Sequence, residues 1–213
     1  MFAIKKVRRP LLGLALVCLA GLSQAAFVTY TTLDAFYGAT AAAGTDSFNN
    51  LAAGDLPSSI SRVAGPYAYN VSSASGLFGA GGADRWLSNF DRREGISFTG
   101  FGSTVTAIGG SFFGSDEAGN AQTDQMIRIT VTDTALAQFS TLLTANSAAS
   151  FFGVASTAPI LSVLIAVDAG NLLAAYPTVN NLFVATVPEP DTYALMLLGL
   201  AAVGRAARRR SKP

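Results

Sequence analysis

Apolar and polar residues alternate along much of the middle of this chain. From Ile127 to Thr132 an apolar side chain occupies every second position, which is the period of a strand with one buried and one solvated face. Residues 160–167 form a more continuous apolar run, which predicts a strand in the centre of a sheet. The full set of predicted strands is 96–101, 105–113, 126–133, 150–154, 160–167 and 182–187.

Turn-forming residues separate these segments. Gly, Ser, Asn and Asp recur about every eight to twelve residues, which is typical of all-β domains. A short helix is predicted over residues 34–42. Six or more strands in about 160 residues are enough for two packed sheets. We therefore predict an all-β domain over residues 26–186, an antiparallel β-sandwich with a jelly-roll-like order of strands.

The N-terminal 25 residues have the layout of a secretory signal peptide. A basic start is followed by an apolar run over residues 11–22 and then by Ser23-Gln24-Ala25-Ala26. The pattern predicts passage through the Sec translocon and cleavage by signal peptidase after Ala25, with Ala26 as the alternative. A permanent N-terminal anchor is the competing interpretation, but twelve apolar residues fall short of the roughly 20 that span a bilayer.

The C-terminal segment, residues 187–213, contains a second short apolar run. Pro188, Glu189 and Pro190 precede it and keep the chain extended. The run itself covers residues 193–204, and a helix of that length reaches only roughly 18 Å of a bilayer core of about 30 Å. The basic cluster behind it is predicted to stop translocation and leave the body outside: Arg205, Arg208, Arg209 and Arg210.

This combination resembles the PEP-CTERM sorting domain, which is also catalogued as the ice-binding protein C-terminal domain. The resemblance covers about 25 residues, from 187 to 211, and makes Pro188, Glu189 and Pro190 the recognition motif. It implies that an exosortase-like membrane transpeptidase removes the tag. It also implies a transient stay in the inner membrane and a final location in the cell envelope, at the cell surface or in the extracellular matrix. An ordinary tail anchor with a chance Pro-Glu-Pro triplet is the alternative.

The body also resembles a recurring ectodomain of PEP-CTERM proteins. The similarity lies in the order of short motifs such as Asp46-Ser-Phe48, Trp86-Leu-Ser-Asn89 and Phe151-Phe-Gly153. Similar exported proteins carry acidic residues near the last strand, where jelly-roll domains hold calcium. Asn180 and Asn181 stand there in this chain, which weakens a calcium assignment, and no cofactor is expected.

Charge and composition exclude several classes of function. Residues 27–187 hold five arginines and eleven acidic residues, a net charge of 5 − 11 = −6, so nucleic acid is not expected as a partner. The chain has no histidine, and its single cysteine, Cys18, lies in the predicted signal peptide. Histidine-based catalytic triads and zinc sites with histidine or cysteine ligands are therefore excluded from the mature body.

Some side chains remain candidates for chemistry. Asp116 and Glu117 are candidate calcium ligands or part of a solvated hairpin turn. Trp86 is a candidate for stacking on a sugar ring or for the core. The Gly-rich residues 79–84 lack the spacing of a phosphate-binding loop. A pair among four acids near strand ends could act as a glycosidase dyad: Asp84, Asp116, Asp124 and Asp168.

Three functional hypotheses follow. The first is a non-enzymatic exported protein of the surface or matrix, sorted through its tag and associated with exopolysaccharide. The second is a secreted glycan-active hydrolase that uses carboxylates. The third is a permanently membrane-anchored periplasmic protein.

Overall fold

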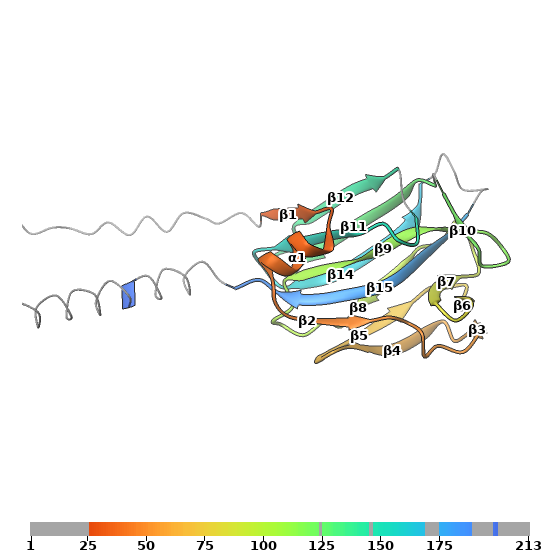
Figure 1. The fold of residues 1–213 in the computed structure, drawn as a ribbon, viewed down its shortest axis with the longest axis horizontal. Helices are drawn as coiled ribbons and strands as arrows, with labels where there is room; N and C mark the ends of the chain where they lie inside the picture. The colour runs from red at the N-terminus through yellow and green to blue at the C-terminus, as the bar shows by residue number, and fades with distance from the viewer. Residues whose placement is uncertain (1–25, 124, 145–146, 169–174, 189–197, 200–213) are drawn as a thin grey trace, which may run out of the picture.

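The computed structural model describes residues 26–123, 125–144, 147–168, 175–188 and 198–199. Its elements, in chain order, are β1 (Phe27–Tyr30), α1 (Leu33–Ala39), β2 (Ala41–Asp46), β3 (Gly54–Leu56), β4 (Ser59–Ala64), β5 (Tyr67–Ser72), β6 (Leu77–Gly81), β7 (Arg85–Asn89), β8 (Ile96–Thr99), β9 (Ala107–Ser115), β10 (Ala121–Gln122), β11 (Ile127–Asp133), β12 (Gln138–Leu143), β13 (Phe152–Ser156), β14 (Ile160–Val167) and β15 (Tyr176–Thr186). The strands form two antiparallel sheets (Figure 1), which confirms the predicted all-β class.

The two sheets differ in size but share one core. The larger sheet follows the order β1-β13-β9-β15-β7-β6-β3, with β2 added beside β15 and β10 beside β9. The smaller sheet follows β12-β11-β14-β8-β5-β4. Fully buried side chains from both sheets meet in a single hydrophobic cluster, among them Leu87 and Val184 of the larger sheet and Phe98 and Ile129 of the smaller one.

Eight of the strands pair in a nested order. β11 pairs with β12 at the centre of the nest, and β9 with β13, β8 with β14 and β7 with β15 enclose it in turn. Successive pairs lie alternately in the smaller and the larger sheet. The chain therefore crosses between the two sheets at each step of this nest.

Apolar and polar side chains alternate in β11, and the apolar ones face the core as predicted. Ile127, Ile129 and Val131 are buried, whereas Arg128 faces solvent. The strand over 160–167 has the predicted bounds and lies in the middle of the smaller sheet, between β11 and β8. Its outer face is not covered, however, because Leu161 and Leu164 are 45% and 43% exposed.

The predicted helix is shorter than expected. The sequence predicts it over residues 34–42, but α1 ends at Ala39 and β2 starts at Ala41, because the chain there joins the edge of β15. Thr32 caps the helix, since its hydroxyl accepts a hydrogen bond from the Ala35 backbone N–H. The helix covers the outer face of the larger sheet with Phe36, which is fully buried.

The predicted targeting segments lie outside the described residues. This holds for all of 1–25 and for the apolar run over 193–204 apart from residues 198–199. Within the part of the chain that the structure describes, no helix has the length and apolar character required to cross a membrane.

The shared core leads to a first prediction. Leu87→Ala should lower the free energy of unfolding of the purified protein by about 2–5 kcal/mol, because it empties space at a fully buried position between the sheets. Leu161→Ala is the matched control and should change it by only about 0.5 kcal/mol, because this side chain is 45% exposed. Urea unfolding followed by circular dichroism measures both. Equal losses would contradict the assignment of the core.

Candidate functional site

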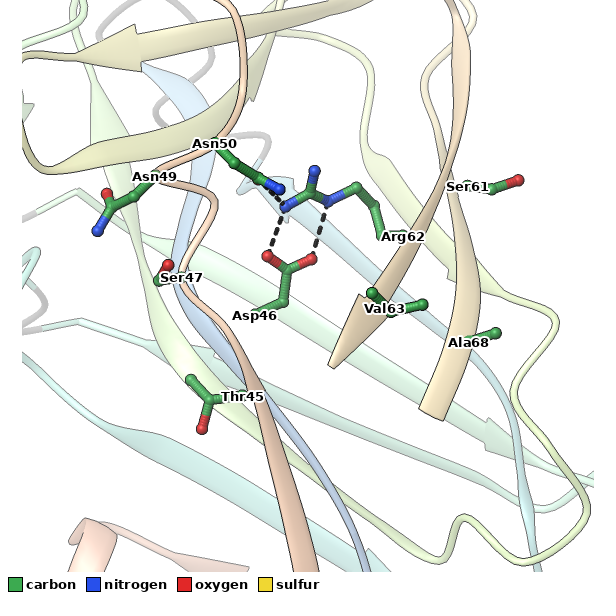
Figure 2. A pocket seen from close by; sticks show the side chains of 9 residues that line it. All are labelled: Thr45, Asp46, Ser47, Asn49, Asn50, Ser61, Arg62, Val63 and Ala68. Atoms are coloured by element: carbon green, nitrogen blue, oxygen red, sulfur yellow. Dashed lines mark hydrogen bonds and ion pairs between the residues drawn. The ribbon is translucent and has the colours of Figure 1, made fainter. Parts of the chain in front are cut away.

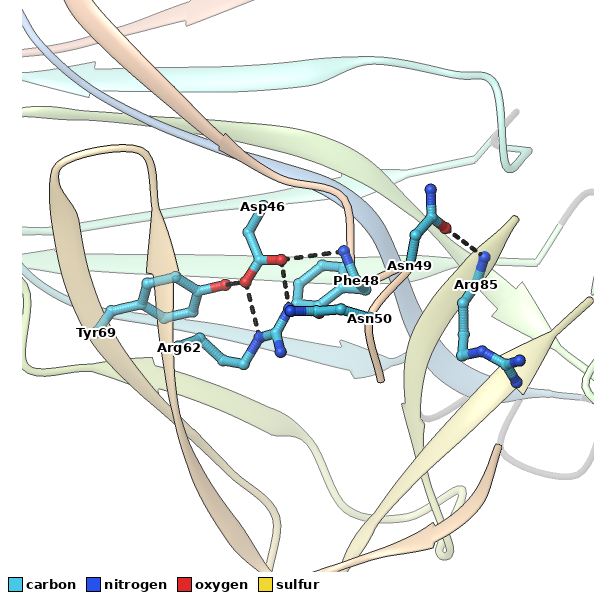
Figure 3. A network of polar contacts seen from close by, with 7 residues as sticks. All are labelled: Asp46, Phe48, Asn49, Asn50, Arg62, Tyr69 and Arg85. Atoms are coloured by element: carbon cyan, nitrogen blue, oxygen red, sulfur yellow. Dashed lines mark hydrogen bonds and ion pairs between the residues drawn. The ribbon is translucent and has the colours of Figure 1, made fainter. Parts of the chain in front are cut away.

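A buried carboxylate joins the two sheets at one edge of the molecule. Asp46 ends β2 in the larger sheet and is 5% exposed. Arg62 of β4 and Tyr69 of β5, both in the smaller sheet, point toward it (Figure 3). Arg62 binds both carboxylate oxygens, with Nε at 2.8 Å and Nη2 at 2.5 Å, and the Tyr69 hydroxyl donates a hydrogen bond of 2.6 Å. This bidentate geometry is the strong form of a carboxylate–guanidinium pair.

The cluster changes the protonation of its members. Burial of Tyr69, followed by the negative charge of Asp46, raises the pKa of the phenol far above its usual range. Burial of the Arg62 guanidinium opposes its charge, but the hydrogen bond and the charge of Asp46 outweigh this effect and raise the pKa of Arg62. The arginine is therefore charged and the tyrosine neutral over the whole physiological range.

A close crossing of backbones brings the members of the cluster together. At Gly44 of β2, an added Cβ would lie 2.0 Å from the carbonyl oxygen of Ala64, so only glycine allows β2 to pass so near the β4–β5 turn. Gly65 in that turn has a φ of +57° and faces Gly44. Two residues beyond this crossing, Asp46 is within reach of the hairpin.

The chain leaves β2 by a sharp turn over the cluster. The Phe48 backbone N–H donates to the Asp46 carboxylate at 3.0 Å, and Phe48 has a φ of 60°, which costs roughly 1–3 kcal/mol for a residue other than glycine. Its ring is fully buried and lies 5.5 Å from the Arg62 guanidinium carbon. Packing and the cation–π contact hold Phe48 in this conformation.

The turn then presents two asparagines. The side-chain oxygen of Asn49 accepts a hydrogen bond of 2.7 Å from the Arg85 backbone N–H. The side-chain oxygen of Asn50 accepts one of 2.7 Å from Arg62 Nη2. Neither side-chain NH₂ group has a hydrogen-bond acceptor among the described residues, so both remain available as donors.

These residues line an open groove of about 740 Å³ (Figure 2). The side chains around it are mostly polar and include Thr45, Ser47 and Ser61. Nη1 of Arg62 has no hydrogen-bond partner among the described residues. The groove therefore presents N–H donors from Arg62, Asn49 and Asn50, and it suits a hydrated ligand rich in oxygen acceptors.

The last strand leads directly into the C-terminal segment. β15 ends at Thr186, and Val187 is still held to the sheet because its backbone N–H donates to the Thr106 hydroxyl at 2.7 Å. Pro188 follows directly.

Residues 186–210 match the family model of the PEP-CTERM protein-sorting motif. The match covers 25 of the 213 residues and confirms the predicted resemblance at the C-terminus. Comparison with curated proteins and with solved structures finds no match.

The PEP-CTERM motif indicates how the protein is exported and processed and where it is located. It implies export, transient anchoring in a membrane, recognition by an exosortase, and a later location in the envelope or outside the cell. Its match includes Pro188, Glu189 and Pro190 and the arginines at 205, 208, 209 and 210. Of these, only Pro188 is a described residue, so their individual roles stay predictions.

The predicted signal-cleavage site is described only in part. Ala25 lies outside the described residues, whereas Ala26 is exposed and directly precedes β1. The position of the cut stays a prediction.

Asp116 and Glu117 lie in the hairpin turn between β9 and β10. The Asp116 carboxylate accepts hydrogen bonds from the Asn120 backbone N–H at 2.7 Å and from the side chains of Asn120 and Gln122; the Asn120 bonds lower the pKa of Asp116. Glu117 lies 4.0 Å from Arg92. No cluster of three potential metal-ligating side chains occurs among the described residues; a role of Asp116 and Glu117 in calcium binding stays a prediction.

Trp86 is packed rather than freely exposed. Its ring makes an edge-to-face contact with Phe113, at 5.4 Å between centroids, and its indole N–H donates to the Gly119 carbonyl oxygen at 3.1 Å. Gly119, Asp116 and Glu117 also line a smaller cavity of about 260 Å³ with Phe90. The candidates Asp116 and Glu117 thus line one cavity, and Trp86 is linked to it through its hydrogen bond to Gly119.

The acids proposed for a glycosidase dyad have separate partners. Asp84 accepts a hydrogen bond from Asn180, and Asp168 forms an ion pair with Arg128. Asp124 is not a described residue. Among the described residues these acids bind different partners, so their contacts give the hydrolase hypothesis no support.

The sequence interpretation missed Arg62 and Tyr69. One available signal was Arg62 itself, since it is one of only five basic residues between positions 27 and 187. Charged residues are rarely buried without a partner of opposite charge, so an isolated arginine such as Arg62 in this lysine-free body indicates an ion pair with an acidic residue.

The cluster leads to a prediction about alkaline stability. In the unfolded chain Tyr69 ionises near the ordinary tyrosine pKa of about 10, but in the fold its pKa is higher. The unfolded state therefore loses the proton first, so the stability due to Tyr69 is fully present below about pH 10 and is lost as the pH rises above it. Urea unfolding between pH 8 and 11 should show a steeper loss for the wild type than for Tyr69→Phe. Parallel pH profiles would contradict this account.

Proposed function

We propose that this protein is an exported, non-enzymatic component of the cell surface or extracellular matrix, sorted through its PEP-CTERM motif. The observation that carries the proposal is the position of the motif, which begins at the last residue of the last strand. A complete β domain thus precedes a removable tag. In this proposal, signal peptidase removes residues 1–25 after Sec-dependent export, and an exosortase removes the C-terminal segment at Pro188–Pro190.

The proposed absence of catalysis follows from the chemistry available to the mature domain. It has no histidine and no cysteine, which are the usual bases and nucleophiles at neutral pH. The groove beside Asp46 has no uncommitted base, since both oxygens of that carboxylate bind Arg62 and one also binds Tyr69. Binding is the function that such a site supports.

We assign extracellular polysaccharide to this groove as its ligand. Sugar hydroxyl and ring oxygens accept hydrogen bonds, and Asn49, Asn50 and Arg62 offer N–H donors that have no acceptor in the described part of the chain. The groove is open and most of the residues that line it are polar, so a chain can lie along it without being enclosed. The negative charge of the body favours a neutral stretch of polysaccharide over a strongly anionic one.

The role of the tag leads to a test in the source cells. Deletion of residues 187–213 should move the exported protein from the envelope to the medium or periplasm, because the membrane-retained form can no longer arise. Cell fractionation followed by immunoblotting measures this, and unchanged fractionation would contradict sorting by the tag. Intact mass of the wild-type envelope form provides the control: a protein that still ends at Pro213 would favour permanent anchoring.

The groove leads to a binding prediction. The double variant Asn49→Ala/Asn50→Ala should bind exopolysaccharide purified from the source bacterium roughly tenfold more weakly, because two hydrogen-bond donors are lost at about 0.5–1.5 kcal/mol each. Isothermal titration with the tag-free protein measures the affinity. Gln138→Ala on the far edge strand β12 is the control and should bind normally. Equal affinity of all three proteins would remove the groove from the proposal.

A further inference from the structure

The two ends of the β domain leave the molecule at the same place. β1 pairs with β13, β13 with β9, and β9 with β15, all antiparallel. Three antiparallel steps make β1 antiparallel to β15, so the start of β1 and the end of β15 lie at one end of the larger sheet (Figure 1). Thr157 binds Ala26 there, and Thr106 binds Val187. We call this region, around Ala26, Thr106, Thr157 and Val187, the end face.

The end face is very close to the Pro-Glu-Pro triplet. The hydrogen bonds of β15 continue through Val187, which is anchored on Thr106, and the triplet starts with the next residue. An extended chain gains at most about 3.6 Å per residue, so Pro190 lies within roughly 11 Å of Val187. A folded enzyme of ordinary size has a radius of more than about 13 Å. An enzyme that binds the triplet is therefore held close to the end face.

The predicted signal-cleavage site adds a second argument. It lies between Ala25 and Ala26, one residue before β1. Both predicted cuts therefore fall next to residues of the end face in the sequence, and the exosortase that makes the second one is expected to be a membrane enzyme. The exported domain must turn this end toward the membrane while it is processed.

The chemistry of the end face is suited to a protein partner. It contains a cavity of about 460 Å³, and none of the side chains that line it is charged, although the body as a whole is acidic. Val28 on β1 is 52% exposed at its rim, and Pro159 and Val187 add further apolar surface. Hydroxyl groups of Thr104 and Thr106 lie among them. A concave surface of apolar and hydroxyl side chains, bordered by the α-amino group that the proposed signal cleavage leaves on Ala26, fits a complementary protein surface.

We propose that the end face is a docking surface for the exosortase, so that the folded domain, and not the tag alone, determines how fast the tag is removed. This inference rests on the proposed function, because it assumes that the tag is cut. The alternative is that the domain merely obstructs the enzyme. The two accounts predict opposite effects when the tag is moved away from the domain.

The first experiment inserts a flexible ten-residue Gly-Ser linker between Val187 and Pro188 of the full chain. Pulse–chase labelling in the source cells follows conversion of the precursor to the tag-free form. Docking predicts slower conversion, because the linker separates the two parts of the recognition surface and lowers their effective concentration. Faster or unchanged conversion would overturn the proposal.

The second experiment changes the surface and keeps the spacing. Val28→Asp should slow conversion roughly tenfold, because it places a charge where an apolar side chain is buried by the enzyme. Leu164→Asp is the matched control, since Leu164 is similarly exposed but lies on the outer face of the smaller sheet, and it should be processed at the wild-type rate. Urea unfolding of both variants verifies that they are folded. Equal rates for Val28→Asp and the wild type would overturn the proposal.

A final measurement separates the enzyme from the bilayer. The tag-free protein is mixed with vesicles of phosphatidylethanolamine and phosphatidylglycerol, and sedimentation measures binding. Docking on the enzyme predicts no vesicle binding that depends on Val28; vesicle binding abolished by Val28→Asp would assign the end face to lipid and overturn the proposal. If the wild-type tag is never removed in the source cells, the proposed function itself fails, which is a different outcome from normal removal in the variants.

Discussion

The ion pair between Asp46 and Arg62 is the interaction on which the open edge of the molecule depends. It joins a strand of the larger sheet to the terminal hairpin of the smaller one, at a place where no backbone pairing links the two sheets. Burying two charges is expensive, and a single buried partner would be more expensive still. The pair is tolerated because the Tyr69 hydroxyl, the Phe48 backbone N–H and Asn50 provide further hydrogen bonds. Such a pair contributes more to fixing how the sheets meet than to net stability.

The same cluster determines the shape of the groove. Arg62 is held by Asp46 on one side and by Asn50 on the other, so its remaining donors have a fixed direction. The crossing at Gly44 and Gly65 fixes the distance between the two walls of the groove. The loop that carries Asn49 and Asn50 is thereby held in place by β2 and the β4–β5 hairpin. Binding of a ligand then costs little conformational entropy, because the loop is already ordered.

Local patterns predicted one part of this structure well and another part poorly. The strands β11 and β14 were identified because their apolar residues follow simple patterns, and the C-terminal tag because it is a contiguous motif. Between residues 41 and 89 the chain forms β2 to β7, none of which was predicted, since glycine, alanine and serine interrupt the alternation there. The cluster joins Asp46 to residues 16 and 23 positions away, and only the close backbone crossing at Gly44 brings them together. No periodicity in the sequence reports such a contact.

Because Val187 is held on Thr106, removal of the tag does not affect the fold of the domain. The fifteen strands and their hydrogen bonds lie before Pro188 in the described part of the chain, so hydrolysis or transfer at the triplet breaks no bond of either sheet. The domain that emerges from processing is thus expected to melt at the same temperature as its precursor. Maturation can then proceed at any time after export, with no refolding step and no transient loss of protection against envelope proteases.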